Sequence, residues 1–193
     1  MPSETVRAIH SDAIAERVMQ AAANLLEEGR SLTFRELSLA SGVPERTLYR
    51  YYPSRRDLLI ELRNWGNRRL DFDGTWPTDA RAAVALVRHA FPLFDRFAPV
   101  ARELLLDPEG SAVLAVDSAQ RRRAAQTLVR SEAPGLDRAD ARRVAAAVQV
   151  LTAANSWHAL HQYWDMSGTE AAEVVALAVE LLLAGARAKA ERN

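Results

Sequence analysis

The amino-acid sequence predicts an all-α fold, and three observations support this prediction. Apolar residues recur at the three- and four-residue spacing of a helix along nearly all of the 193 residues. No run of β-branched and aromatic residues between turn residues has the alternating pattern of a strand. Proline and glycine interrupt the helical pattern often enough to divide the chain into about nine helices.

The first two helices are expected near the N-terminus. A helix over residues 11–28 has its apolar side chains on one stripe, formed by Ile14, Val18, Ala21, Ala22 and Leu25. It should end at Gly29, because glycine readily adopts the left-handed conformation that closes a helix. The next helix should begin after Thr33, because Thr33 and Glu36 have the spacing of a capping box.

A tight turn over residues 41–43 should separate this second helix from a third. The third helix should begin at Pro44, where the missing proline N–H would be unpaired in any case, and end near residue 52, before Pro53. Ser54 is placed to cap a fourth helix that continues through Trp65.

Beyond residue 70 the sequence predicts a helical body. Breaks rich in proline and glycine separate five expected helices, at 79–97, 100–106, 111–132, 137–165 and 169–190. We therefore expect two domains: an N-terminal three-helix helix-turn-helix domain over residues 10–56, and a C-terminal helical ligand-binding and dimerisation domain over residues 57–190.

Composition excludes several classes of function. The chain has no cysteine, which rules out disulfides, thiolate catalysis and thiolate metal sites. The N-terminus has no signal-peptide pattern, and the longest apolar stretch, 174–186, is shorter than the roughly 20 residues of a membrane-spanning helix. We expect a soluble, cytoplasmic protein that does not bind membranes.

Positive charge is concentrated in one segment of a neutral chain. Lys and Arg together number 25, as do Asp and Glu, so the whole molecule has no net charge to attract nucleic acid. Residues 30–69, however, contain nine arginines and four acidic residues, a local net charge of +5. Any affinity for DNA must come from such a local patch.

The third predicted helix has a face suited to DNA. If Leu48 points to the core, Arg46 and Arg50 lie one turn apart on the opposite side, with Thr47 and Tyr49 beside them. An arginine fork binds guanine O6 and N7 together, which discriminates between bases by about 1–3 kcal/mol. Arg46 and Arg50 are therefore the predicted base-reading residues.

Two more residues are predicted to hold the DNA backbone. Thr33 and Arg55 each lie at the start of a helix, where backbone N–H groups and the helix dipole favour a phosphate. Such contacts position a protein on DNA and do not read the base sequence.

These motifs together resemble the DNA-binding domain of the TetR family. The similarity covers about residues 18–59 and is carried by four segments: Thr33-Phe34-Arg35-Glu36-Leu37, Ser41-Gly42-Val43-Pro44, Thr47-Leu48-Tyr49-Arg50-Tyr51-Tyr52 and Pro53-Ser54-Arg55-Arg56-Asp57-Leu58-Leu59. Tyr52 and Arg55 replace the phenylalanine and lysine that are commonest in the family, and both keep the chemical character.

The resemblance implies which residues contact DNA: Arg35, Thr47, Tyr49, Arg50 and Tyr51. For Tyr51, burial in the core and contact with a phosphate remain alternatives. The surface arginines also have a simpler interpretation, as solvated side chains of an ordinary helix.

The last two predicted helices, 137–165 and 169–190, are apolar around most of their circumference. Such helices need cover on nearly all sides, so a second copy of the chain is expected to pack on them. The resemblance implies the same four-helix interface. A homodimer would place two reading helices about 34–36 Å apart, in successive major-groove segments.

The resemblance also implies a ligand pocket in the body, for a small apolar or aromatic effector. The residues expected to line it are Phe91, Phe94, Asn155, Trp157, His158 and His161. The alternative is that these aromatic residues form ordinary core. His158, His161 and Asp165 have a spacing that would let them share one helix face and bind a metal, but we expect solvated or hydrogen-bonded side chains there, with no metal and no cofactor.

Taken together, the sequence predicts a DNA-binding transcriptional regulator: a homodimeric repressor of a palindromic operator, released by a small-molecule ligand. An enzyme is not expected, because the chain has no serine beside a plausible base and no glycine-rich phosphate loop. The alternatives are an enzyme that uses residues 158, 161 and 165, and a dimeric module that has lost DNA binding.

Overall fold

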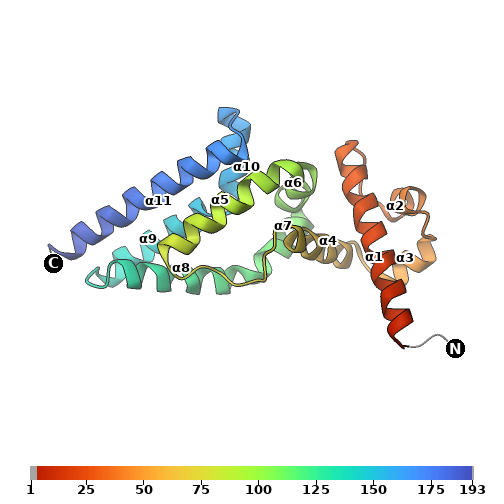
Figure 1. The fold of residues 1–193 in the computed structure, drawn as a ribbon, viewed down its shortest axis with the longest axis horizontal. Coiled ribbons are helices and arrows are strands. Elements are labelled where there is room, and N and C mark those ends of the chain that lie inside the picture. The colour runs from red at the N-terminus through yellow and green to blue at the C-terminus, as the bar shows by residue number, and fades with distance from the viewer. Residues whose placement is uncertain (1–3, 193) are drawn as a thin grey trace. The chain divides into compact units, whose positions relative to one another are not determined.

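The computed structural model describes residues 4–192, with side chains from residue 12 onward. These residues form helices α1 to α11 and contain no strand, which confirms the all-α prediction (Figure 1). The N-terminal helices are α1 (Glu4–Glu27), α2 (Phe34–Ser41), α3 (Glu45–Tyr51) and α4 (Arg55–Arg69). The others are α5 (Ala80–Arg96), α6 (Ala98–Leu106), α7 (Pro108–Leu114), α8 (Ser118–Glu132), α9 (Arg138–Leu151), α10 (Ala154–Trp164) and α11 (Gly168–Ala190).

The chain forms two compact units. The first runs from α1 to Asp71 and also includes Pro99–Leu114, so α6 and α7 belong with the N-terminal helices. The second consists of Phe72–Ala98 and the chain from Ala115 onward. The expected boundary between residues 56 and 57 lies inside the first unit, directly after the start of α4.

The core of the first unit is built from one apolar face of each N-terminal helix. Its most deeply buried side chains are Val18, Met19, Ala22, Leu25, Leu37, Leu48, Leu58, Leu59, Leu62 and Trp65. The Trp65 indole N–H donates to the Glu16 carboxylate at 3.2 Å, and the Arg69 guanidinium lies 3.8 Å above the Trp65 ring. The polar atom of the largest core residue is therefore paired, as burial requires.

The helix expected over 111–132 is divided, and its first part starts earlier. The sequence Asp107-Pro108 was expected to break the chain, but Pro108 is the first residue of α7. Asp107 Oδ1 accepts hydrogen bonds from the amides of Glu109 (2.9 Å) and Gly110 (3.0 Å), which makes Asp107 the cap of this helix. A 3-10 turn, Ala115–Asp117, then separates α7 from α8.

The helix expected over 137–165 is also divided, into α9 and α10. The Thr152 hydroxyl donates to the carbonyl of Val148 at 2.9 Å, and the Ser156 hydroxyl donates to the carbonyl of Val150 at 2.8 Å. Hydroxyl groups that bond nearby carbonyls in this way compete with the helix for its own acceptors. These two divisions explain why the chain has more helices than the nine expected.

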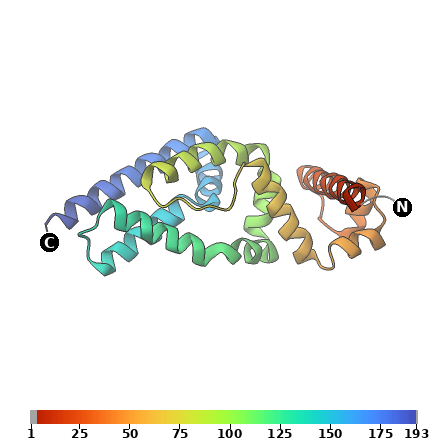
Figure 2. The same cartoon turned by 60° about the horizontal axis from the view of Figure 1, so that its bottom comes forward.

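The second unit is organised around α5 and α11, which run side by side in opposite directions in both ribbon views (Figure 2). Their buried residues are mostly small or β-branched, including Ala83, Val84, Val87, Ala172, Val175, Ala176 and Val179. The two helices are in close contact where α11 begins: a Cβ built on Gly168 would lie 2.2 Å from the carbonyl oxygen of Phe91. Among the residues the structure describes, no helix is both long and apolar enough to cross a membrane.

This close approach gives a first prediction. Gly168→Ala should lower the free energy of unfolding by about 1–3 kcal/mol, because the atoms that the new methyl group meets belong to backbone that cannot rotate away. Gly66→Ala is the control, because the space around that helical glycine is open. Alanine there should raise the free energy of unfolding by about 0.5–1 kcal/mol. Urea denaturation measures both, and equal stability of the two variants would contradict the close approach.

Candidate nucleic-acid interface

The start of α2 is capped by Thr33 as the sequence predicts, but only one of the two hydrogen bonds of the expected capping box is present. Thr33 Oγ1 accepts from the amide of Glu36 at 3.2 Å. The Glu36 carboxylate does not complete the capping box and instead forms an ion pair with Arg30. Thr33 and Arg35 both lie exposed at this end of the helix.

The turn between α2 and α3 is held in a defined shape. Gly42 has φ of 67° and ψ of 13°, the left-handed conformation, and its N–H donates to the carbonyl of Ser38. The buried Ser41 hydroxyl accepts from the amide of Val43 at 3.2 Å. Because left-handed φ is costly for residues with a Cβ, glycine is the residue that fits this turn.

Helix α3 presents the face that the sequence predicts. Leu48 is fully buried, while Arg46, Tyr49 and Arg50 are exposed and Thr47 is half-buried. The ring of Tyr49 stacks on that of Phe34 at the start of α2, with centroids 4.3 Å apart. Phe34 was not recognised as part of the site, since its partner lies on another helix. The stack holds Tyr49 in a fixed position beside the arginines.

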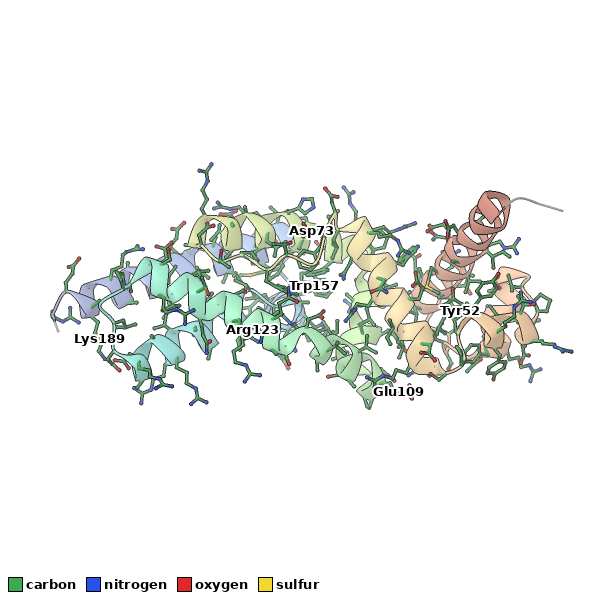
Figure 3. All side chains as sticks on the ribbon, turned by 90° about the horizontal axis from the view of Figure 1, so that it is seen from below. Tyr52, Asp73, Glu109, Arg123, Trp157 and Lys189 are labelled. Atoms are coloured by element: carbon green, nitrogen blue, oxygen red, sulfur yellow. The ribbon has the colours of Figure 1, made fainter. Side chains whose placement is uncertain are left out.

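The two tyrosines that end α3 differ in their surroundings. Tyr52, labelled in Figure 3 at the junction of α3 and α4, is buried, and its burial together with the nearby Glu61 carboxylate raises its pKa to about 12. Tyr51 is half-buried, and the Arg50 guanidinium lies 5.3 Å from its ring centroid. Tyr52 is thus a core residue, while Tyr51 remains within reach of solvent.

The arginines of residues 30–69 fall into two groups. Five of them bond other parts of the first unit: Arg30 to Glu28 and Glu36, Arg55 to Glu103 and Asp107, Arg63 to the Val113 carbonyl, Arg68 to Glu61, and Arg69 to Glu16. The other four are exposed and have no carboxylate partner among the described residues: Arg35, Arg46, Arg50 and Arg56. The uncompensated charge therefore lies on α2, α3 and the start of α4.

The predicted ligand-binding residues lie in the second unit, and five of the six come together around one tryptophan. We call Phe91, Phe94, Trp157, His158 and His161 the Trp157 cluster. Phe91 and Trp157 are buried, and ring centroids in the cluster lie 5.4–6.2 Å apart. Asn155 is exposed and takes no part in these ring contacts.

Asp95 is a residue of this region that sequence reasoning missed. One of its carboxylate oxygens accepts from the Trp157 indole N–H at 2.8 Å, and the other accepts from the amide of Gly168 at 2.6 Å. A buried tryptophan needs an acceptor for its N–H, but the sequence does not show which residue supplies it.

The three residues considered as an alternative metal site, His158, His161 and Asp165, do not share one helix face. Asp165 ends α10 with a φ of 54°, so it leaves the helical spacing that it would share with His158 and His161. Across the described residues there is no group of three histidine, cysteine or acidic side chains that could hold a metal ion. The His161 ring instead contacts the carbonyl of Met166, with Nδ1 at 3.2 Å from the oxygen.

A capped helix, a glycine turn and a short second helix with an exposed cationic face define a DNA-binding protein of the helix-turn-helix class. Residues 18–62 match the family model described as "Bacterial regulatory proteins, tetR family". Residues 18–62 therefore form a TetR-type helix-turn-helix domain, and this domain supports a role as a DNA-binding transcriptional regulator. No curated protein matches this chain.

The cap of α2 can be tested by itself. Thr33→Ala should lower the free energy of unfolding by about 1 kcal/mol, because it leaves the Glu36 amide without its acceptor. Thr33→Ser, which keeps the hydroxyl, should stay near the wild-type value. Chemical denaturation followed by circular dichroism makes the comparison, and the interpretation fails if alanine and serine behave alike.

Proposed function

We propose that the protein is a homodimeric repressor that binds a palindromic operator and leaves it when a small-molecule ligand binds. The observation that carries the DNA-binding part is the set of arginines without carboxylate partners on α2, α3 and the start of α4. An exposed guanidinium with no partner inside the protein loses no ion pair when it binds DNA. Occupation of the operator would then block transcription sterically.

The proposed contacts divide by what each residue can reach. Arg46 and Arg50, with Thr47 and Tyr49 beside them, would enter the major groove and read base edges. Thr33, Arg35 and Tyr51 lie at the margins of this face and would bind phosphates. Arg56, which was not among the predicted site residues, is exposed on the first turn of α4 and is a further phosphate contact of the same kind.

The homodimer is supported by an exposed apolar stripe on α11. Val174, Leu177 and Leu181 have 38%, 58% and 65% of their surface exposed, and their spacing of three and four residues places them on one face. The opposite face of α11 packs on α5, α9 and α10, and the described residues of the second unit leave most of Leu177 and Leu181 exposed. At the end of α10, Tyr163 and Trp164 are 80% and 71% exposed.

A second copy of the chain is the occupant that this stripe fits best. A two-fold axis would pair the stripe with itself, so that each leucine meets apolar surface. Large exposed apolar patches on soluble proteins commonly mark such interfaces. The same symmetry would give the two reading helices that a palindromic site requires.

The proposed effector site is the Trp157 cluster. Aromatic rings in contact around the buried Trp157 suit a small apolar or aromatic molecule, and His158 and His161 supply polar atoms beside them. A ligand that enters this cluster would have to displace ring contacts around Trp157. It would therefore favour a different packing of α5, α10 and α11.

The DNA-binding proposal predicts the behaviour of Arg50→Ala. Selection from a random duplex pool at low salt should enrich an inverted repeat. Arg50→Ala should bind this duplex roughly 5- to 150-fold more weakly than the wild-type protein. The variant should also show a relaxed preference at one base pair of each half-site. Fluorescence anisotropy measures the affinities. Arg122→Ala, which removes one exposed arginine from α8, is the charge-matched control. Failure to enrich any duplex would overturn the proposal.

The homodimer predicts a second result. Leu177→Glu should convert the dimer to a monomer, because it places a charge in the centre of the apolar stripe. Val116→Glu is the matched control, since Val116 is 59% exposed but lies outside that stripe. Analytical ultracentrifugation at micromolar concentration gives the masses. A wild-type protein that sediments as a monomer would contradict the dimer.

A further inference from the structure

Arg55 has surroundings that differ from those of a phosphate-binding side chain. It is the first residue of α4, where the positive end of the helix dipole disfavours a cation. The backbone at this helix start is already satisfied, because Ser54 and Asp57 form a complete capping box. Arg55 therefore contributes nothing favourable to its own helix start, and its partners must lie elsewhere.

Those partners are carboxylates from α6 and from the turn that leads into α7. Asp107 binds the guanidinium at two points, with N–O distances of 2.8 Å and 3.1 Å, and Glu103 binds it at 2.5 Å. The carboxylate of Glu109, which is labelled in Figure 3 and lies on the first turn of α7, is 3.9 Å from the Arg55 guanidinium. Arg55 retains 31% of its side-chain exposure, Glu103 21% and Asp107 24%, so this ion pair is partly shielded from water.

Asp107 has two roles at once. Its Oδ1 caps α7 by accepting from two backbone amides, while both of its oxygens bind Arg55. The bonds from Arg55 lower the pKa of Asp107, and burial raises the pKa of Glu103. A bidentate pair between an arginine and a carboxylate fixes direction as well as distance. One carboxylate therefore links the starts of α4 and α7.

The packing around this link is tight. A Cβ built on Gly110 would lie 2.6 Å from the Glu103 carbonyl oxygen, so α7 starts in close contact with α6. Further along α4, Arg63 donates to the Val113 carbonyl at 3.1 Å, at the other end of α7. Only residues 52–54 separate the end of α3 from the start of α4. A displacement of Arg55 would therefore reach the end of α3 through only three residues.

We propose that Arg55 is a positioning residue, held by Asp107 and Glu103, that fixes α3 for binding to DNA and does not itself bind a phosphate. This inference rests on the proposed DNA-binding function. It replaces the phosphate contact that the place of Arg55 at a helix start predicted. It also gives the α6–α7 turn, which carries none of the predicted DNA contacts, an effect on DNA affinity.

The two roles predict opposite results for Asp107→Asn. Asparagine still caps α7, so the substitution removes the charge and keeps the cap. If Arg55 positions α3, Asp107→Asn should weaken binding to the selected duplex roughly tenfold, as Arg55→Gln should, and the double variant should be no weaker than either single one. If Arg55 bound a phosphate, releasing it from Asp107 would tighten binding.

The salt dependence supplies a second readout. The slope of log affinity against log salt should be unchanged by Arg55→Gln, whereas loss of a phosphate contact lowers the slope by about one. Arg56→Gln, which changes an exposed neighbour without a carboxylate partner, is the control expected to lower it. Glu103→Gln is a second test should Asp107→Asn unfold the protein, with the same weakening expected.

The failures are distinguishable. If wild-type protein binds no duplex, the proposed function is overturned and this inference with it. If wild-type protein binds but Asp107→Asn binds more tightly, or the effects of the two single variants add, only the role of Arg55 is overturned.

Discussion

The first unit depends on one constraint: a helix of seven residues must be held rigidly although it buries only one side chain, Leu48. A helix this short is unstable in water by itself, so its shape must come from its neighbours. α2 holds it through the left-handed turn at Gly42 and the stack of Phe34 on Tyr49. α4 begins only three residues after the other end of α3, and Tyr52, the first of those residues, is buried. The remaining face of α3 is then free to carry arginines.

Charge is distributed according to the same division. Four arginines of residues 30–69 are matched by acids, as Arg69 is by Glu16, and Arg63 bonds a backbone carbonyl of α7. Those on the outward face of α2 and α3, such as Arg35, Arg46 and Arg50, have no such partner among the described residues. A protein whose total charge is zero can therefore still present a cationic surface, because its acidic residues neutralise arginines on other parts of the molecule.

Local sequence patterns predicted the exposed face of α3. They could not predict contacts between residues that are far apart in the sequence. The buried side of α3 follows from helical spacing alone. The turn between α2 and α3 could be predicted because it contains a glycine, Gly42. The partners of Arg55 lie 48 and 52 residues away in the sequence, so no local pattern identifies them. Asp95 was missed for the same reason. The start of α7 was misjudged because a proline after an aspartate can either break a helix or begin one.

The central claim is that the outward face of α3 lies in the major groove. Methylation of guanine N7 by dimethyl sulfate tests it most directly, because N7 is exposed only in that groove. On the selected duplex, the wild-type protein should protect guanines in both half-sites, about 10 base pairs apart from centre to centre. Arg46→Ala and Arg50→Ala should each restore methylation at particular guanines. Guanines that stay fully reactive throughout both half-sites of the bound duplex would contradict the account.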